Sequence, residues 1–284
     1  MLPITVVTDS DASIPADLAE RHGIRQIPIT VQFGRQSFES GVDIDDHELF
    51  ARIDRDGRLP TTAAPTAGKY VDAFKAALAS GSQAVLCFCV SSKVSASYQA
   101  AVTARNMLPE QDITVIDTNS LSMGQGFMAI AAQEAIEAGA TKGEALQQAL
   151  DTGRRTHLFA ALSTLKYLVM GGRASHITAG VATVFDIKPI LTIREGKLEL
   201  LERVRTQKKA WARLVELVVQ AGAGKSVERM AVLHVNAQAE ASRLQQQITA
   251  AITCPGDIIV AELTPGLSVH AGAGVVGAVL VNAA

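Results

Sequence analysis

The chain of 284 residues carries a formal net charge of −2, with 48% hydrophobic and 19% charged residues. This composition is typical of an α/β protein with buried parallel strands, and the near-neutral charge with only 4% aromatic residues argues against a nucleic-acid-binding face. No apolar run approaches the ~20 residues that a membrane span needs, and the first residues lack a signal-peptide pattern, so we expect a cytoplasmic protein without stable membrane insertion.

In residues 1–155, short apolar runs alternate with helical patterns. Strands are expected at residues 4–8, 29–33, 84–90 and 113–117. Helices are expected at residues 14–22, 45–53, 66–78, 95–107, 127–138 and 141–152. This alternation predicts a parallel, doubly wound sheet in an N-terminal α/β domain.

Residues 156–284 mix strands and helices in a different order. Residues 188–194 and 197–204 flank Glu195-Gly196 and are expected to form a hairpin. Further strands are expected at residues 158–162, 230–235, 258–263 and 275–281, and helices at residues 165–170, 178–185, 207–220 and 237–252. The pattern predicts a C-terminal mixed α/β domain that packs against the first domain, with a ligand tunnel between them.

His270 has the most distinctive sequence surroundings of any polar residue in the chain. Gly272 and Gly274 leave the backbone bare beside it, so that a ligand could approach closely. No Cys, Asp or Glu lies near it in sequence that would make it a metal ligand or the base of a nucleophile. These surroundings favour a histidine that donates a hydrogen bond to an anionic head group.

Three turns are rich in hydroxyl side chains: residues 8–10 and 91–98, which each follow a predicted strand, and residues 60–66, which precede a predicted helix. Hydroxyls and backbone N–H groups at a helix N-terminus can bind an anion. For any one of these turns alone, an ordinary N-cap, which Ser and Thr favour, is the better interpretation. Two such turns at strand carboxyl ends, together with Thr62 and His270, indicate one shared site.

A hydrolase is the alternative that these residues leave open. Ser92 or Ser95 could be the nucleophile of an acyl hydrolase with His270 as its base, and Asp9 is the nearest candidate for an orienting acid. A sugar- or phosphate-binding module is a third possibility.

Two arginines lie where they could meet phosphate or a partner protein. Arg173 follows Gly171-Gly172 at an expected turn, and Arg205 lies between a predicted strand and a predicted helix. The guanidinium group suits phosphate recognition, although a solvated positive face explains either arginine equally well.

Taken in order, these segments resemble the DegV family of bacterial fatty-acid-binding proteins over essentially the whole chain. Several short segments carry the resemblance together, through their order along the sequence. They are Thr8-Asp9-Ser10, residues 41–44, Pro60-Thr61-Thr62 with Pro65, residues 91–101, Gly171-Gly172-Arg173, residues 187–191, Val204-Arg205 with Lys208-Lys209, and residues 270–274.

The resemblance implies a two-domain protein that buries one long-chain fatty acid in an apolar tunnel. It implies that the carboxylate is held by Thr62, by a serine of the Ser91-Ser92 pair and by His270, with Ser95 as a further candidate. The bare backbone at Gly272 and Gly274 is expected to lie beside the ligand. No cofactor is implied besides the fatty acid itself.

The same resemblance implies a carrier rather than an enzyme. Members of the family present the bound acid to a separate fatty acid kinase subunit, which uses ATP to form an acyl phosphate that feeds phospholipid synthesis. Arg205 resembles the arginine linked to that kinase reaction or to docking, and Arg173 is a second candidate.

Five alanines depart from the family pattern around the expected head-group site, and they replace other residues, some of them hydroxyl-bearing. They are Ala63, Ala64, Ala96, Ala271 and Ala273. Thr62, Ser95 and His270 remain. A buried carboxylate needs hydrogen bonds, which these side chains supply, and each buried methylene of a tail adds ~0.8 kcal/mol.

Overall fold

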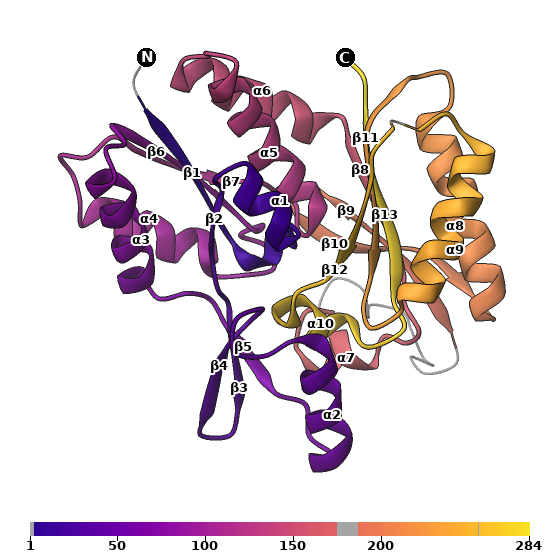
Figure 1. Cartoon of the computed structure of the whole chain (residues 1–284). Coiled ribbons are helices and arrows are strands. Elements are labelled where there is room, and N and C mark those ends of the chain that lie inside the picture. Colours follow the sequence, from indigo (N-terminus) through magenta and orange to yellow (C-terminus); the bar gives the residue numbers. More distant parts are fainter. Residues whose placement is uncertain (1–2, 175–186, 255) are drawn as a thin grey trace.

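The structure is a computed structural model that describes residues 3–174, 187–254 and 256–284. A four-stranded parallel sheet occupies the first half of the chain (Figure 1). Its strands, in spatial order, are β2 (Arg25–Ile27), β1 (Ile4–Asp9), β6 (Ala84–Cys89) and β7 (Ile113–Asp117). Every residue of β6 is buried, because helices cover both faces of this sheet.

Helices lie on two sides of the parallel sheet, as predicted (Figure 1). One side carries α3 (Ala67–Ala79) and α4 (Ser97–Asn106), and the other carries α5 (Met123–Glu137) and α6 (Lys142–Arg154). The short helix α1 (Ala16–Arg21) lies against β2. Helix α5 begins four residues before the predicted start at residue 127. Its first ten residues are all buried, so that this part has no polar face from which a helical period could be read.

The strand predicted at residues 29–33 lies outside the parallel sheet. It forms β3 (Thr30–Phe33), which pairs antiparallel with β4 (Gln36–Glu39) and β5 (Thr61–Ala63) in a separate three-stranded sheet. Gly34 has φ +58°, which suits the two-residue turn of a tight hairpin and returns the chain beside β3. Helix α2 (Asp46–Asp56) follows this hairpin.

The second half of the chain forms a six-stranded mixed sheet, whose strands lie in the six segments predicted to be strands. In spatial order its strands are β10 (Lys197–Val204), β9 (Lys188–Arg194), β8 (Thr156–Ala161), β13 (Val276–Asn282), β11 (Val227–His234) and β12 (Ile258–Glu262). Only β11 and β12 pair in parallel. The antiparallel pairing of β9 and β10 confirms the predicted hairpin.

Helices α8 (Gln207–Gly222) and α9 (Gln238–Ala251) cover the outer face of the six-stranded sheet (Figure 1). The helix expected at residues 165–170 is α7 (Lys166–Met170), whereas the helix expected at residues 178–185 lies outside the described residues. The expected boundary at residue 155 falls just before β8, between the two larger sheets. As a division into two domains it stays a prediction.

One apolar core joins the two halves of the chain. Helix α5 contacts β1 and β6 of the parallel sheet and also β8, β11 and β13 of the mixed sheet. Buried residues from both halves, among them Leu86, Phe127 and Val279, belong to the same cluster. Ion pairs flank this contact, and the one between Arg229 and Glu134 links β11 to α5.

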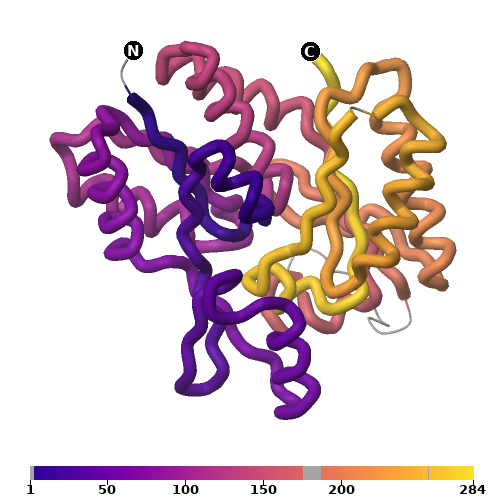
Figure 2. Tube along the Cα trace, in the orientation of Figure 1, coloured from indigo at the N-terminus to yellow at the C-terminus, as the bar shows by residue number. Residues whose placement is uncertain are grey.

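Helix α10 (Pro265–Ala271) is an element that the sequence did not predict. It begins with a proline, which is favoured at the first helical position, but seven residues are too few to show a helical period. The Cα trace brings α10, near the C-terminus, beside segments from the first fifth of the chain (Figure 2). Its neighbours include α2, β3, β5 and the 3₁₀ turn Ser10–Ala12.

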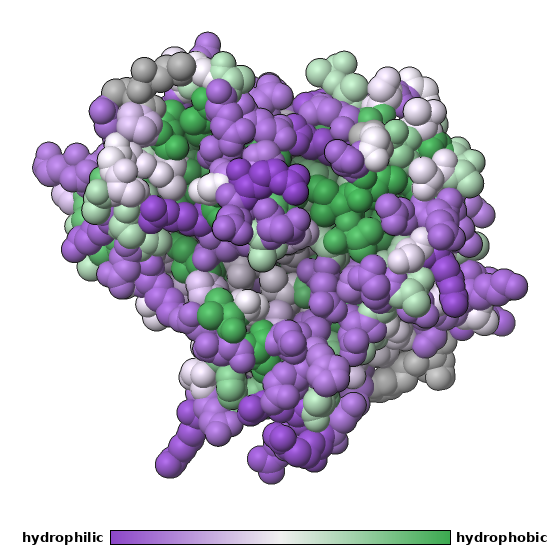
Figure 3. Space-filling model, viewed as in Figure 1, coloured by the Kyte–Doolittle hydropathy of each residue, from purple (hydrophilic) through white to green (hydrophobic). Residues whose placement is uncertain are grey.

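Polar side chains cover most of the face seen in Figure 3. Apolar side chains gather over the region of the edge strand β12, where Ile258, Ile259 and Val260 are partly exposed. Within the described ranges, none of the helices has the length and apolar character to cross a membrane.

Candidate functional site

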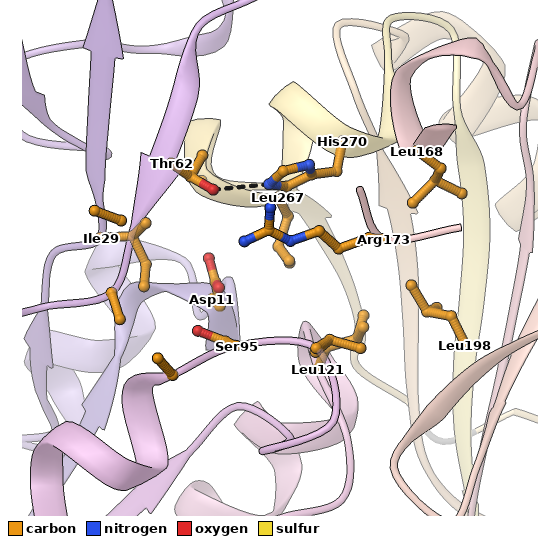
Figure 4. Close-up of a pocket in the computed structure, with 15 residues that line it drawn as sticks. Asp11, Ile29, Thr62, Ser95, Leu121, Leu168, Arg173, Leu198, Leu267 and His270 are labelled. Atoms are coloured by element: carbon orange, nitrogen blue, oxygen red, sulfur yellow. Dashed lines mark hydrogen bonds between the residues drawn. The ribbon is translucent and has the colours of Figure 1, made fainter. Parts of the chain in front are cut away.

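A cavity of about 250 Å³ is lined by residues from both halves of the chain (Figure 4). Aliphatic side chains form most of its wall. They are Ile29, Val94, Leu121, Leu168, Leu198 and Leu267. The polar side chains that reach the cavity are Asp11, Thr62, Ser95, Arg173 and His270. This mixture suits a ligand with a long apolar part and one anionic end.

Thr62 and His270 meet at one side of the cavity. His270 Nε2 lies 2.8 Å from Thr62 Oγ1, although the two residues are 208 positions apart. Thr62 comes from β5 and His270 from the last turn of α10. The predicted association of these two residues in one site is therefore seen as a direct hydrogen bond.

Several hydrogen bonds to the first part of the chain fix α10 in place. The backbone N–H of Gly266 donates to Ser40 Oγ at 2.9 Å, and Ser268 Oγ donates to Asp46 Oδ2 at 2.7 Å. Ahead of the helix, Thr264 Oγ1 donates to the carbonyl of Ser10 at 3.0 Å. The position of His270 is therefore set by contacts along the whole helix.

The imidazole of His270 is neutral at physiological pH. Burial, together with a smaller effect of the positive charge of Arg173, lowers its pKa to about 4. Among the described residues Nδ1 has no hydrogen-bond partner. We therefore assign the proton to Nε2, which donates to Thr62 and leaves the Thr62 hydroxyl hydrogen free for a ligand.

Gly171 provides the space that the imidazole occupies. A Cβ added at this position would overlap His270 Nδ1. Next along the chain, Arg173 reaches into the cavity, and its Nη1 donates to the carbonyl of Gly171 at 2.6 Å (Figure 4). The segment from Gly171 to Arg173 thus supplies both a cationic group and room for the histidine.

Asp11 is an acidic lining residue that the sequence analysis did not single out. It is 6% exposed, and its Oδ1 has no hydrogen-bond partner in the described structure. Burial raises its pKa well above the usual range, the carboxylate of Asp9 raises it further, and Arg173 opposes this effect. The signal in the sequence was an acidic residue directly after a hydroxyl turn, which by itself is common at turns.

The three candidate serines have different surroundings. Ser95 lines the cavity, and its Oγ lies 3.0 Å from Ser97 Oγ. Ser91 is fully buried and donates from Oγ to the carbonyl of Gly196 at 2.7 Å, in the turn between β9 and β10. Ser92 is exposed and lines a neighbouring cavity of about 370 Å³. Only Ser95 of the three lines the same cavity as Thr62 and His270.

Gly272 and Gly274 both have positive φ, at +81° and +79°. A Cβ on Gly272 would overlap the ring of Tyr167, and a Cβ on Gly274 would lie 2.9 Å from Ser163 Oγ. Neither glycine lines the cavity. Their bare backbone therefore accommodates protein side chains.

The five alanines divide into two groups. Ala63, Ala64 and Ala96 line the cavity and add apolar surface beside Thr62 and Ser95. Ala271 and Ala273 pack against the central core.

Arg205 is exposed and follows the end of β10. The other end of that strand reaches the cavity at Leu198. The structure thus brings Arg173, and not Arg205, to the cavity.

The contacts of Asp9 and His270 weigh against the hydrolase alternative. Asp9 accepts hydrogen bonds from the backbone N–H of Val90 at 2.9 Å and from Gln125 Nε2 at 3.0 Å, so that it does not orient the histidine. The histidine is bonded to Thr62 instead of Ser92 or Ser95. The described ranges also contain no cluster of three His, Cys, Asp or Glu side chains able to hold a metal ion.

Another cavity, of about 400 Å³, is also lined by the Thr62–His270 pair. Thr62, Arg173 and His270 line both cavities. Arg58 and Met170 add an exposed cation and an exposed apolar side chain to the second one. The hydrogen-bonded pair is therefore accessible from both cavities.

Comparison with known proteins gives concordant results. Residues 3–283 match the model of a family described as uncharacterised proteins of the DegV family. A DegV domain-containing protein of Streptomyces coelicolor is 33% identical over 277 residues, which cover 98% of each chain. One from Mycobacterium bovis is 34% identical over 278 residues, covering 97% of this chain and 96% of the relative.

Solved structures agree with these sequence matches. A DegV family protein of Thermus thermophilus, described in terms of fatty acid binding, superposes with a TM-score of 0.92 at 28% identity, covering 99% of this chain and 100% of the other. DegV of Bacillus subtilis, described as a fatty acid binding protein, gives a TM-score of 0.90 at 26% identity over the full length of both chains.

Proposed function

Because the chain belongs to the DegV family, we propose that it binds a single long-chain fatty acid in the 250 Å³ cavity and its neighbours. The carboxylate lies at Thr62 and His270, with Ser95 as a second hydroxyl donor. The observation that carries this proposal is the hydrogen-bonded Thr62–His270 pair at the edge of an aliphatic cavity.

The chemistry of the cavity supports an anionic head group with an apolar tail. The hydroxyl groups of Thr62, oriented by neutral His270, and of Ser95 supply hydrogen-bond donors, and Arg173 supplies a positive charge. Each methylene removed from water contributes ~0.8 kcal/mol, so that a long tail binds tightly without polar contacts of its own.

The tail extends beyond the first cavity. Its volume of about 250 Å³ lies below the ~300–1,000 Å³ typical of ligand pockets. The neighbouring 370 Å³ cavity shares Val94, Ser95, Ala96, Arg173 and Leu198 with it. A long chain bound in both would lie along Leu198.

We further propose that the protein is a carrier, and that a separate kinase subunit phosphorylates the bound carboxylate with ATP to form an acyl phosphate for phospholipid synthesis. The 400 Å³ cavity gives such a subunit a route to Thr62 and His270. Met170, which is 58% exposed, lies beside Arg58 and Arg173 at this opening. Exposed Arg205 is the candidate for a more distant docking contact.

Mass spectrometry of lipids extracted from the purified protein tests the binding proposal. We expect about one fatty acid per chain. A protein that carries no fatty acid and takes up none when it is added would contradict the proposal. For the carrier role, loaded protein, ATP and a fatty acid kinase catalytic subunit should yield an acyl phosphate that hydroxylamine traps, whereas loaded protein with ATP alone should yield none.

A further inference from the structure

Asp11 is held by its backbone, while its carboxyl group is left to interact with the contents of the cavity. Its N–H donates to Asp9 Oδ1 at 3.2 Å, and its carbonyl accepts from the N–H of Ser122 at 2.7 Å. The side chain lines the cavity, is 6% exposed, and has one oxygen without a partner in the described structure. A buried polar group in this state destabilises the fold unless something satisfies it.

Helix α10 brings this carboxyl group close to the proposed head-group site. A Cβ added at Gly266 would lie 2.7 Å from Asp11 Oδ1, so that the helix approaches Asp11 through its bare backbone. Gly266 and His270 are four positions apart on α10 and lie on the same side of the helix, about one turn from each other. Asp11, which lies beside Gly266, and His270 thus line one cavity about one helical turn apart along α10 (Figure 4).

The charged and titratable groups around Asp11 come from three elements. Asp9 at the end of β1 adds a negative charge, Arg173 after α7 adds a positive charge, and His270 on α10 is neutral at physiological pH. A bound carboxylate would bring a further negative charge into the same small space. Two carboxyl groups that share a buried site do not both ionise, because the charged pair is strongly disfavoured.

We infer that Asp11 is a further binding residue of this cavity, which retains a proton in the complex and donates a hydrogen bond from its carboxylic acid to the bound carboxylate. This inference rests on the proposed function. Where Asp11 is ionised in the free protein, each binding event takes up one proton from solution. Burial and Asp9 already raise the pKa of Asp11 in the absence of ligand, which keeps the cost of this protonation small.

If Asp11 must be protonated in the complex, the affinity for the fatty acid falls as the pH rises. Binding requires protonated Asp11, so that affinity is full below the pKa of Asp11 in the free protein. Above that pKa, affinity falls by about tenfold for each pH unit. Asp11→Asn removes the titration and retains an N–H donor for the carboxylate, so its affinity should stay flat where that of the wild type falls.

Isothermal titration with dodecanoate, in two buffers of different ionisation enthalpy between pH 5.5 and 9, measures both affinity and proton uptake. We expect the wild type to take up about one proton at the alkaline end and Asp11→Asn to take up none. Asp54→Asn, at an exposed position of α2 that does not line this cavity, is the control and should retain the wild-type pH dependence.

Each outcome of this titration decides one question. Wild-type binding without proton uptake, or equal uptake in Asp11→Asn, would overturn the role of Asp11 and leave the proposed function standing. A wild type that binds no dodecanoate at any pH would overturn the proposed function and this inference with it. If Asp11→Asn does not fold, Asp11→Ala serves in its place, with pH-independent affinity expected and a weaker plateau at low pH because the donor is lost.

Discussion

The loop after β6 and the helix α10 both bring polar side chains toward the same cavity, from opposite halves of the chain. In the loop, buried Ser91 bonds the carbonyl of Gly196 and exposed Ser92 lines a neighbouring cavity, so that only Ser95 lines the cavity itself. In α10, Ser268 bonds Asp46 and holds the helix, while His270 reaches the cavity and Thr62. In both segments, therefore, some polar side chains stabilise the fold and others line the cavity. The hydrogen-bond partner of each side chain shows which of the two roles it has.

Replacing His270 by alanine should produce the largest effect on binding. The imidazole N–H donates to Thr62 and so directs the Thr62 hydroxyl hydrogen toward the proposed carboxylate, and a hydrogen bond to a charged group contributes about 1.5–3 kcal/mol. We expect fatty acid affinity to fall about 10- to 100-fold, measured by titration with a fluorescent fatty acid. His47→Ala, at an exposed position of α2, is the control. Equal affinities of the two variants would remove His270 from the site.

Gly171→Ala tests whether the position of the imidazole matters as much as its presence. The added methyl group would overlap His270 Nδ1, so that the imidazole must move away from Thr62. We expect about a tenfold loss of affinity, with the Thr62–His270 contact followed by the NMR shifts of the ring. Gly143→Ala in α6, where an added Cβ meets nothing within 4 Å, should leave affinity unchanged. Wild-type affinity in Gly171→Ala would show that the site tolerates a displaced ring.

Ser91→Ala should act on stability rather than on binding. It leaves the buried carbonyl of Gly196 without its donor, at a cost of about 1–3 kcal/mol in the free energy of unfolding. Urea denaturation of the lipid-free protein measures this change. The neighbouring variant Ser92→Ala, at an exposed position, should stay within about 0.5 kcal/mol of the wild type. A Ser91→Ala protein of normal stability that no longer binds fatty acid would reverse the assignment of the two roles.

The burial of His270 should also make the stability of the fold depend on pH. The pKa of His270 is about 4 in the folded protein, below the ordinary value of 6.5. The unfolded chain therefore binds more protons between these values, and stability is lost as the pH falls from about 6.5 to 4. The wild type should lose on the order of 1–3 kcal/mol of its free energy of unfolding in this way. His270→Asn should not show this loss.

Asp9 and Asp46 act in the opposite direction, since burial raises the pKa of each, to about 6 and about 7. Their contribution is common to the wild type and His270→Asn, and it cancels in the difference between the two unfolding curves. A difference that does not change between pH 7 and pH 4.5 would mean that the imidazole is as easily protonated in the fold as in the unfolded chain.

The long, regular elements could be predicted from the sequence, whereas several short ones could not. The strands β1, β6 and β7 and the β9–β10 hairpin follow from apolar runs and the Glu195-Gly196 turn. Helix α10 was missed because seven residues with Pro265 and Gly266 at the start show no period. The separate position of β3 depends on its pairing with β4 and β5, which the run of apolar residues alone does not specify.

The candidate site was predicted in part, by resemblance and by the choice of residue types. The hydrogen bond between Thr62 and His270 brings together two of the expected residues. Ser91 and Ser92 are adjacent and chemically alike, yet one is buried and the other exposed, and this difference depends on the direction in which the chain leaves β6. Asp11 was missed because the burial of an acidic side chain is a property of the folded chain.

The continuous core around α5 has a consequence for how a cargo would be exchanged. A hinge motion that parted the two sheets would expose apolar surface from both halves, at about 25 cal/mol for each Å². Release by such a motion is therefore expensive, and smaller movements at the cavity mouths, such as a rotation of the Arg173 side chain, are the easier route. A molecule built this way would exchange a bound ligand through its cavity mouths rather than by parting its two larger sheets.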